Sequence, residues 1–167
     1  GSLPYCREAV SYLSKIFVDK KPKAFVHTFG CQQNEADSEK LAGMAQDMGY
    51  ELCDDPADAD LIAVNTCAIR EHAEKKALSI IGQYKHIRAR NPDLIIGVCG
   101  CMTAQEHRRE ELKMKYPYVT FTLGTASLHH FPKVLWDVIE QKRRFITAES
   151  EEDFTKTVAE GAPIRRE

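Results

Sequence analysis

The apolar residues of this chain follow two different spacings, and the change from one to the other predicts strands separated by helices. Short apolar or alternating runs predict strands at 23–28, 50–53, 60–65, 94–99 and 119–123. Apolar residues at helical spacing predict helices at 5–17, 35–48, 71–90 and 104–115, and a last helix with Ser127 as its N-cap. From about residue 147 no regular pattern continues.

Strands that alternate with helices indicate an α/β domain, because parallel neighbouring strands need a crossover that is usually a helix. Such crossovers are right-handed, so helices cover both faces of the sheet. We predict a three-layer, open, mostly parallel sheet of flavodoxin-like type. Its expected bounds are 22–147, with an N-terminal extension over 1–21 and a linker toward an absent domain over 148–167.

Composition and charge exclude several classes of protein. The length of 167 residues suits one domain, and 43% hydrophobic with 29% charged residues is typical of a globular chain. A net charge of −2 argues against a broad cationic surface for nucleic acid. No apolar run approaches the roughly 20 residues of a membrane span, and no signal peptide opens the chain. We expect a cytoplasmic location without membrane contact; the sequence leaves the oligomeric state open.

Six cysteines are the unusual feature, and three of them share a position relative to the predicted strands. Cys31, Cys67 and Cys101 each follow a strand, separated by 36 and 34 residues, which is close to the length of a βαβ unit. Parallel strands bring such loops to one carboxyl edge, where α/β folds bind ligands. In a reducing cytosol thiols more often bind metal than form disulfides. Three thiols at one edge can hold iron or zinc, so the spacing makes a shared metal site a candidate, beside the alternative of three buried hydrophobic side chains.

The residues beside these cysteines fit a bulky metal centre. Gly30 and Gly100 each precede a cysteine, and the missing Cβ would let the backbone approach a ligand closely. Asn34, Asn65 and Thr66 are candidate donors to cluster sulfur. The alternative is that the two glycines only form turns and that Asn65 and Thr66 only cap the following helix.

Zinc would need a fourth ligand, for which His27, His72 and His107 are candidates. Cys99 makes a C-x-C pair with Cys101 but lies inside an apolar strand, so we expect it to be buried and inert. Cys6 and Cys53 belong to no pattern.

Three segments resemble the N-terminal domain of the methylthiotransferases: TFGCQQNEADSEK at 28–40, NTCAIREHAEKK at 65–76 and VCGCM at 98–102. With GTASLHHFP at 124–132, the chain resembles the tRNA-modifying MiaB type more than the sister RimO type, which acts on a ribosomal protein. The resemblance covers about residues 22–147. Residues 101–106 depart from the run usual in this family, so no role is carried over to Gln105.

The resemblance implies a radical S-adenosylmethionine enzyme with two 4Fe–4S clusters. This domain would hold the auxiliary cluster through Cys31, Cys67 and Cys101, leave one iron without a protein ligand, and supply sulfur. The acceptor would be C2 of an isopentenylated adenosine beside the anticodon, in tRNA bound by the full-length enzyme. S-adenosylmethionine and the second cluster would belong to a domain with a C-x-x-x-C-x-x-C motif. That spacing is absent from these residues, so we expect this chain alone to be inactive, with no catalytic residue and little or no tRNA binding.

Alternative functions remain at this point. A methylthiotransferase could act on a different tRNA base or on a ribosomal protein. From another class, the chain could be a metal-free flavodoxin-like binding module or a structural zinc domain. A G-x-G-x-x-G or Walker sequence, which would indicate a nucleotide site, does not occur.

Overall fold

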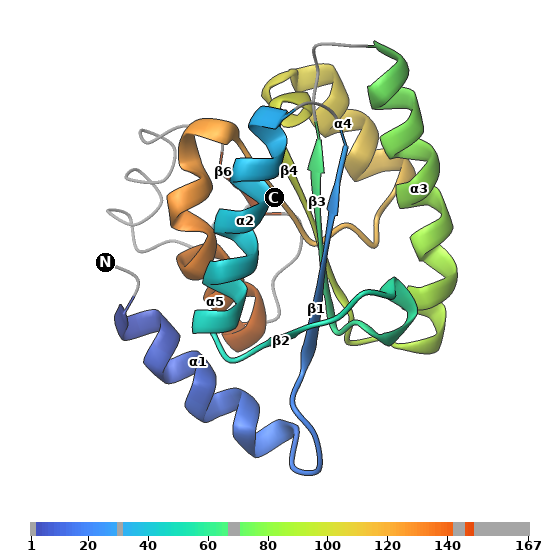
Figure 1. Cartoon of the computed structure of the whole chain (residues 1–167). Helices are drawn as coiled ribbons and strands as arrows, with labels where there is room; N and C mark the ends of the chain where they lie inside the picture. The colour runs from blue at the N-terminus through green and yellow to red at the C-terminus, as the bar shows by residue number, and fades with distance from the viewer. Residues whose placement is uncertain (1–2, 30–31, 67–70, 142–145, 149–167) are drawn as a thin grey trace.

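A parallel β-sheet runs through the middle of the molecule, with helices on both faces (Figure 1). The computed structural model describes residues 3–29, 32–66, 71–141 and 146–148. The strands are β1 (Lys23–Thr28), β2 (Glu51–Leu52), β3 (Leu61–Thr66), β4 (Ile95–Gly100), β5 (Phe121–Leu123) and β6 (Ile146–Ala148). Their order is β2-β1-β3-β4-β5-β6, and every neighbouring pair is parallel. The predicted three-layer, flavodoxin-like class is confirmed.

The helices divide between the two faces. They are α1 (Leu3–Ile16), α2 (Gln32–Asp47), α3 (Glu71–Arg90), α4 (Glu106–Lys115) and α5 (Phe131–Gln141), with short 3-10 turns η1 (Pro56–Asp58), η2 (Cys101–Ala104) and η3 (Thr125–His130). Helices α1, α2 and α5 lie together on one face, and α3 and α4 lie on the other (Figure 1). The chain therefore changes faces between β1 and β3, which is the switch point of this strand order.

Strand β3 explains why the chain needs both layers of helices. All six of its residues are buried. Because successive side chains point to opposite faces, Leu61 belongs to the core under α1, α2 and α5, whereas Ile62 and Val64 belong to the core under α3 and α4. Strand β4 alternates in the same way, with Cys99 on the first face and Val98 on the second.

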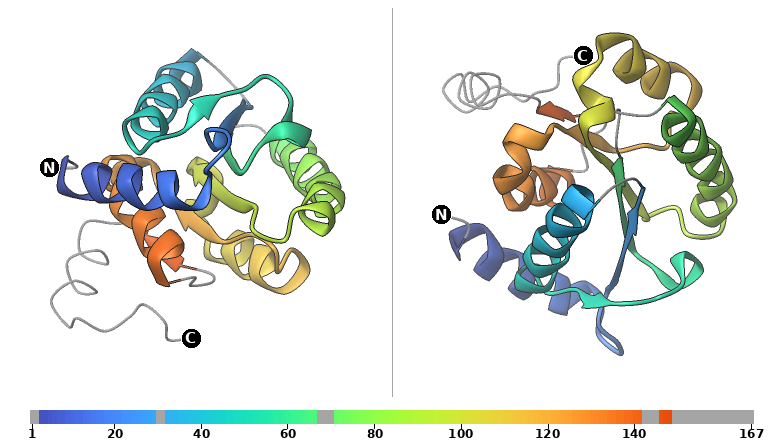
Figure 2. Two further views of the ribbon diagram at one scale, coloured as in Figure 1. Left: turned by 90° about the horizontal axis from the view of Figure 1, so that it is seen from below. Right: turned by 45° about the horizontal axis from the view of Figure 1, so that its top comes forward.

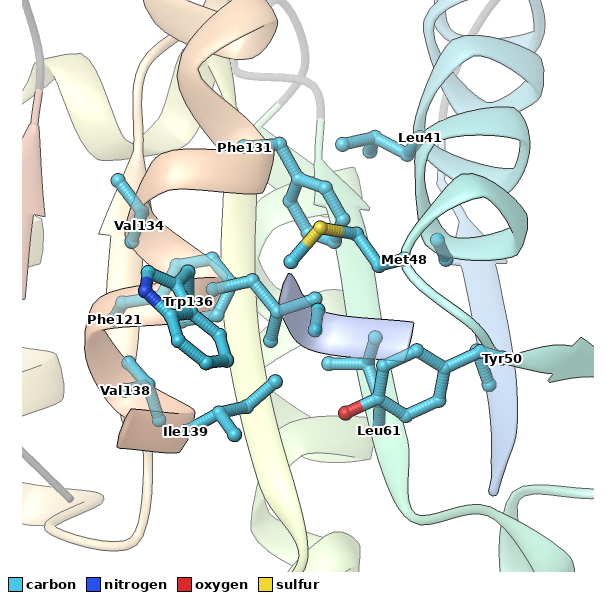
Figure 3. Close-up of a cluster of buried hydrophobic side chains, with 14 of the residues drawn as sticks. Leu41, Met48, Tyr50, Leu61, Phe121, Phe131, Val134, Trp136, Val138 and Ile139 are labelled. Atoms are coloured by element: carbon cyan, nitrogen blue, oxygen red, sulfur yellow. The ribbon is translucent and has the colours of Figure 1, made fainter. Parts of the chain in front are cut away.

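The core on the first face is closed by aromatic side chains. Figure 3 shows Phe131 of α5 and Met48, in the turn directly after α2, meeting over the sheet, with Phe121 and Trp136 beside them. Helix α1 closes the same core: Tyr12 packs edge-on against Trp136, with ring centroids 5.9 Å apart. Cys6, Ala9 and Leu13 of α1 are also buried there, so the segment whose role the sequence left open forms part of the core.

Several element bounds differ from the sequence prediction. The predicted N-cap at Ser127 is wrong: Ser127 lies within η3, and α5 begins at Phe131, followed by Pro132, a residue favoured in the first turn of a helix. The helix predicted from 104 begins at Glu106, after η2. Strand β6, which the sequence did not predict, reaches Ala148. The rest of the predicted linker, 149–167, lies outside the described residues.

None of the helices in the described part of the chain combines the length and the apolar character that crossing a membrane requires.

Two glycines provide a matched test of how tightly the sheet is packed. A Cβ on Gly97 of β4 would overlap the ring of the fully buried Phe121, whereas a Cβ on Gly43 of α2 meets nothing within 4 Å. We expect Gly97→Ala to lower the free energy of unfolding by about 1–3 kcal/mol through overpacking. Gly43→Ala should raise it by about 0.5–1 kcal/mol, because alanine favours a helix. Urea unfolding measures both, and equal effects of the two substitutions would contradict this account.

Candidate metal centre at the carboxyl edge of the sheet

The carboxyl ends of the three central strands lie level with one another. Thr28 of β1 pairs with Asn65 of β3, Asn65 pairs with Cys99 of β4, and one step further Thr66 pairs with Gly100. The upper ends of β1, β3 and β4 come together in the view with the top of the molecule forward (Figure 2). In sequence, Cys67 directly follows Thr66 and Cys101 directly follows Gly100, so the last register pair of β3 and β4 immediately precedes two of the candidate ligands.

The Thr66 side chain ties the end of β3 to the turn at the end of β4. Its hydroxyl donates to the carbonyl of Cys99 at 2.8 Å and accepts from the backbone N–H of Met102 at 3.3 Å. These two partners stand on either side of Gly100 and Cys101. Thr66 is fully buried, so one hydroxyl fixes the backbone on both sides of a candidate ligand.

Gly100 must be glycine in this arrangement. Its φ of 105° lies in a region that side chains rarely adopt, and a Cβ there would strike the Thr66 carbonyl. The structure shows a close approach of Gly100 to the Thr66 backbone; the approach of Gly100 to a bulky ligand stays a prediction.

A second buried network joins the ends of β1 and β3 to α2. The Asn65 amide donates to Ser38 Oγ at 2.9 Å, and Ser38 Oγ lies 2.6 Å from the hydroxyl of Thr28. The backbone N–H of Phe29 donates to the carbonyl of Asn65 at 2.9 Å, which extends the β1–β3 ladder. Both strands that precede Cys31 and Cys67 are thus held by the same group of hydrogen bonds. Donation from Asn65 or Thr66 to cluster sulfur stays a prediction.

His27 is engaged inside the protein. Its ring stacks on Phe29, with centroids 4.3 Å apart, and its Nδ1 lies 3.0 Å from the hydroxyl of Tyr84. Burial, with a smaller contribution from the charge of Lys76, lowers the pKa of His27, and burial raises the pKa of Tyr84 to about 12. The stack anchors the chain two residues before Cys31.

Several predicted site residues lie outside the described residues or are described in backbone only. Gly30, Cys31 and Cys67 fall in the first group. Cys101 opens η2, while Asn34 and His72 lie in α2 and α3, with the backbone alone described. Among the side chains that are described, no three His, Cys, Asp or Glu residues form a group that could hold a metal ion. The ligand set therefore stays a prediction.

The other three cysteines and the candidate zinc ligand His107 differ in their surroundings. Cys99 is fully buried among apolar side chains, and Cys6, a residue of α1, is buried in the same core. Cys53 is half-buried; burial raises the pKa of its thiol, which lies 3.5 Å from the carbonyl of Asp55. His107 is exposed on α4.

Sequence reasoning missed two buried polar residues at this edge, Ser38 and Glu74, which are 8% and 5% exposed. Ser38 contacts Thr28 and Asn65, which are 10 and 27 residues away along the chain, and the partners of Glu74 are 31 and 34 residues away. The only local signal was a polar residue at a helix position that faces the sheet.

A pocket of about 440 Å³ lies at the opposite, amino edge of the sheet. Asp60, Leu94 and Thr120, which precede β3, β4 and β5, line it together with Tyr12 and Phe17 of the α1 region. The pocket is therefore separated from the candidate metal centre by the length of the strands.

Comparison with known proteins decides the family. Residues 23–124, which include the whole carboxyl edge described above, match the model of "Uncharacterized protein family UPF0004". The chain belongs to this family. The resemblance to the N-terminal domain of the methylthiotransferases is thereby confirmed.

Three curated relatives share one description. The chain is 44% identical over 142 residues to a tRNA-2-methylthio-N(6)-dimethylallyladenosine synthase of Thermoanaerobacter sp. (strain X514), covering 85% of this chain and 30% of the relative. The corresponding synthase of Clostridioides difficile (strain 630) is 46% identical over 127 residues, covering 76% and 27%. That of Clostridium tetani is 40% identical over 156 residues, covering 92% and 34%. This UPF0004 chain thus spans about a third of the length of these relatives.

The Thr66 hydroxyl can be tested by removing it without changing the shape of the side chain. Thr66→Val leaves the Met102 N–H and the Cys99 carbonyl without this partner in a buried place. We expect the free energy of unfolding to fall by about 1–3 kcal/mol. Thr66→Ser, which keeps the hydroxyl, should lower the free energy of unfolding by less in the same urea titration. A valine variant as stable as the serine variant would show that the hydroxyl contributes nothing.

The lowered pKa of His27 predicts a dependence of stability on pH. The unfolded chain takes up a proton near the ordinary pKa of 6.5, whereas the folded chain does so only at lower pH. Stability is therefore lost as the pH falls from about 6.5 toward the folded pKa. We expect His27→Gln to reduce the difference between urea midpoints measured at pH 7.5 and pH 5.5. An unchanged difference would contradict the assignment to His27.

Proposed function

We propose that this chain is the auxiliary 4Fe–4S-binding domain of a tRNA-2-methylthio-N6-dimethylallyladenosine synthase, with Cys31, Cys67 and Cys101 as the iron ligands. One observation carries the proposal: the level carboxyl ends of β1, β3 and β4 each lead within three residues to one of these cysteines. Residues far apart in sequence are thereby directed to one edge, at the switch point where such folds bind ligands.

The chemistry of the donor set fits an iron–sulfur cluster. Thiolates are the usual ligands of such clusters, and three of them leave one iron without a protein ligand. Cys31 directly precedes α2, and Cys67 lies four residues before α3. The partial positive charge of a helix N-terminus favours a thiolate over a thiol. When bound, the cluster would provide the iron site that carries the sulfur to be transferred.

The protein's own part is to hold the ligand segments in place. Thr66 and Gly100 fix the chain on either side of Cys101, and the Asn65–Ser38–Thr28 network fixes the ends of β1 and β3. In this proposal, Asn65, Thr66 and Gly100 support the cluster by holding the backbone of the ligand segments in place. The other residues proposed to surround the cluster are Gly30 and Asn34. No residue of this chain is proposed to be catalytic.

The substrate and the remaining parts are proposed from the relatives. They are tRNA-modifying synthases about three times as long as this chain, so the radical S-adenosylmethionine centre, with its own 4Fe–4S cluster, and most tRNA contacts would lie in the rest of the protein. The acceptor would be an isopentenylated adenosine beside the anticodon, and the compartment would be the cytoplasm, where tRNA is modified. The chain alone would be inactive.

Iron loading tests the ligand set directly. After anaerobic reconstitution with iron and sulfide, we expect about four irons per chain and broad visible absorption, as the proposed cubane requires. Replacing Cys31, Cys67 or Cys101 with Ala should each abolish most of the bound iron and the absorption.

Cys53→Ala and Cys6→Ala serve as matched controls and should load iron like the unmodified chain. Full iron in the Cys67→Ala variant would refute the ligand assignment. Stoichiometric zinc without iron would favour a structural zinc domain, and a yellow flavin spectrum without iron would favour the metal-free binding module.

A further inference from the structure

Glu74 is a buried carboxylate beside the candidate metal centre. It lies in the first turns of α3 and is 5% exposed. A buried charge is costly unless it is paired and hydrogen bonded. Glu74 satisfies both conditions through α4 and the residue before it: its Oε2 accepts from Gln105 Nε2 at 2.7 Å, and its Oε1 accepts from Arg108 Nε at 3.0 Å and Nη2 at 2.9 Å.

Arg108 is itself held in place. Its Nη1 donates to Glu111 Oε1 at 2.7 Å, one turn further along α4. The next residue, Arg109, donates to the carbonyl of Thr103 at 2.7 Å, which ties α4 back onto η2. Glu74 therefore binds a preorganised arginine rather than a mobile surface side chain.

Gln105 occupies a position where the local preference is for another residue type. It is the N-cap of α4, and its side chain makes no capping hydrogen bond. Ser, Thr, Asp and Asn are the preferred N-cap residues, because their short side chains reach the free N–H groups of the first turn. Here the side chain is used instead to reach Glu74. Because Gln105 departs from the local N-cap preference and makes a long-range contact instead, we infer that this contact has a function.

The contact joins the two segments that carry Cys67 and Cys101. Glu74 follows Cys67 by seven residues, and Gln105 follows Cys101 by four. Thr66, directly before Cys67, is already bonded to the carbonyl of Cys99 and the N–H of Met102. The Cys67 segment is therefore fastened to the Cys101 segment at both of its ends.

We propose that Glu74, Gln105 and Arg108 form a brace that positions the Cys67 and Cys101 segments relative to each other and so slows the loss of the metal centre. The brace residues are positioning residues: they act on the ligands through the backbone of α3 and η2. This inference rests on the proposed function, because it assumes that Cys67 and Cys101 share a metal.

The Gln105→Ser substitution distinguishes an effect on the position of the ligand segments from an effect on the stability of the fold. Serine restores a preferred N-cap on α4 while removing the donor to Glu74, so the thermal midpoint should stay within a few degrees of that of the unmodified chain. In the same variant, an iron chelator should remove iron from the reconstituted protein about tenfold faster, the scale expected when a partner outside the ligand shell is lost. Gln83→Ala, at an exposed glutamine on α3, is the matched control and should release iron at the unmodified rate.

The outcomes separate the two proposals. If the unmodified chain loads iron and Gln105→Ser releases it at the same rate, the brace is refuted and the ligand assignment stands. If the unmodified chain takes up no iron, the proposed function fails, and amide hydrogen exchange on the metal-free protein decides about the brace. Faster exchange at residues 102–105 in Gln105→Ser would then support the brace as a structural device, and unchanged exchange would refute it.

Discussion

The pairing of β3 with β1 on one side and β4 on the other is the constraint on which the rest of the molecule depends. All six residues of β3 are buried; Leu61 belongs to one core, and Ile62 and Val64 belong to the other. A slip of one residue would exchange Leu61 with Ile62 and turn both faces of the strand away from their partners. Because that slip is so costly, the register is firmly set, and the register is what brings Thr28, Asn65 and Cys99 to one level.

The carboxyl edge shows how a site can be supported by residues that are unremarkable in sequence. Thr66, Ser38 and Glu74 are buried polar side chains, and each is satisfied by a partner from a different element. Buried networks of this kind favour a single arrangement of the chain, because leaving any of their polar groups without a hydrogen-bond partner costs free energy. The edge is therefore rigid in its described parts, and this suits a centre whose ligands come from three separate loops.

Sequence reasoning found the elements whose signals are local. The apolar runs of β1, β3 and β4 and the apolar stripe of α3 were sufficient, and the bounds 71–90 agree with the structure. Ser127 was misplaced because capping preference is a local signal, while the start of α5 depends on Phe131 and the proline after it. Asn65 and Thr66 were named from the sequence as candidate site residues. Their partners Ser38 and Cys99 lie in α2 and β4, and these contacts depend on helix packing and strand pairing that could not be read from the chain. The bond between Gln105 and Glu74 spans 31 residues and was invisible for the same reason.

The family match and the folded unit do not coincide, and helix α1 shows the consequence. The match covers residues 23–124, whereas α1 and α5, which cover one face of the sheet together with α2, lie outside it. A polypeptide trimmed to the matched residues would lose the α1 and α5 side chains from the core that contains Leu61, Phe121 and Leu123, and the apolar surface exposed in this way is of the kind that drives aggregation. The matched span is thus smaller than the folded unit, because α1 and α5 contribute side chains to one of its two cores.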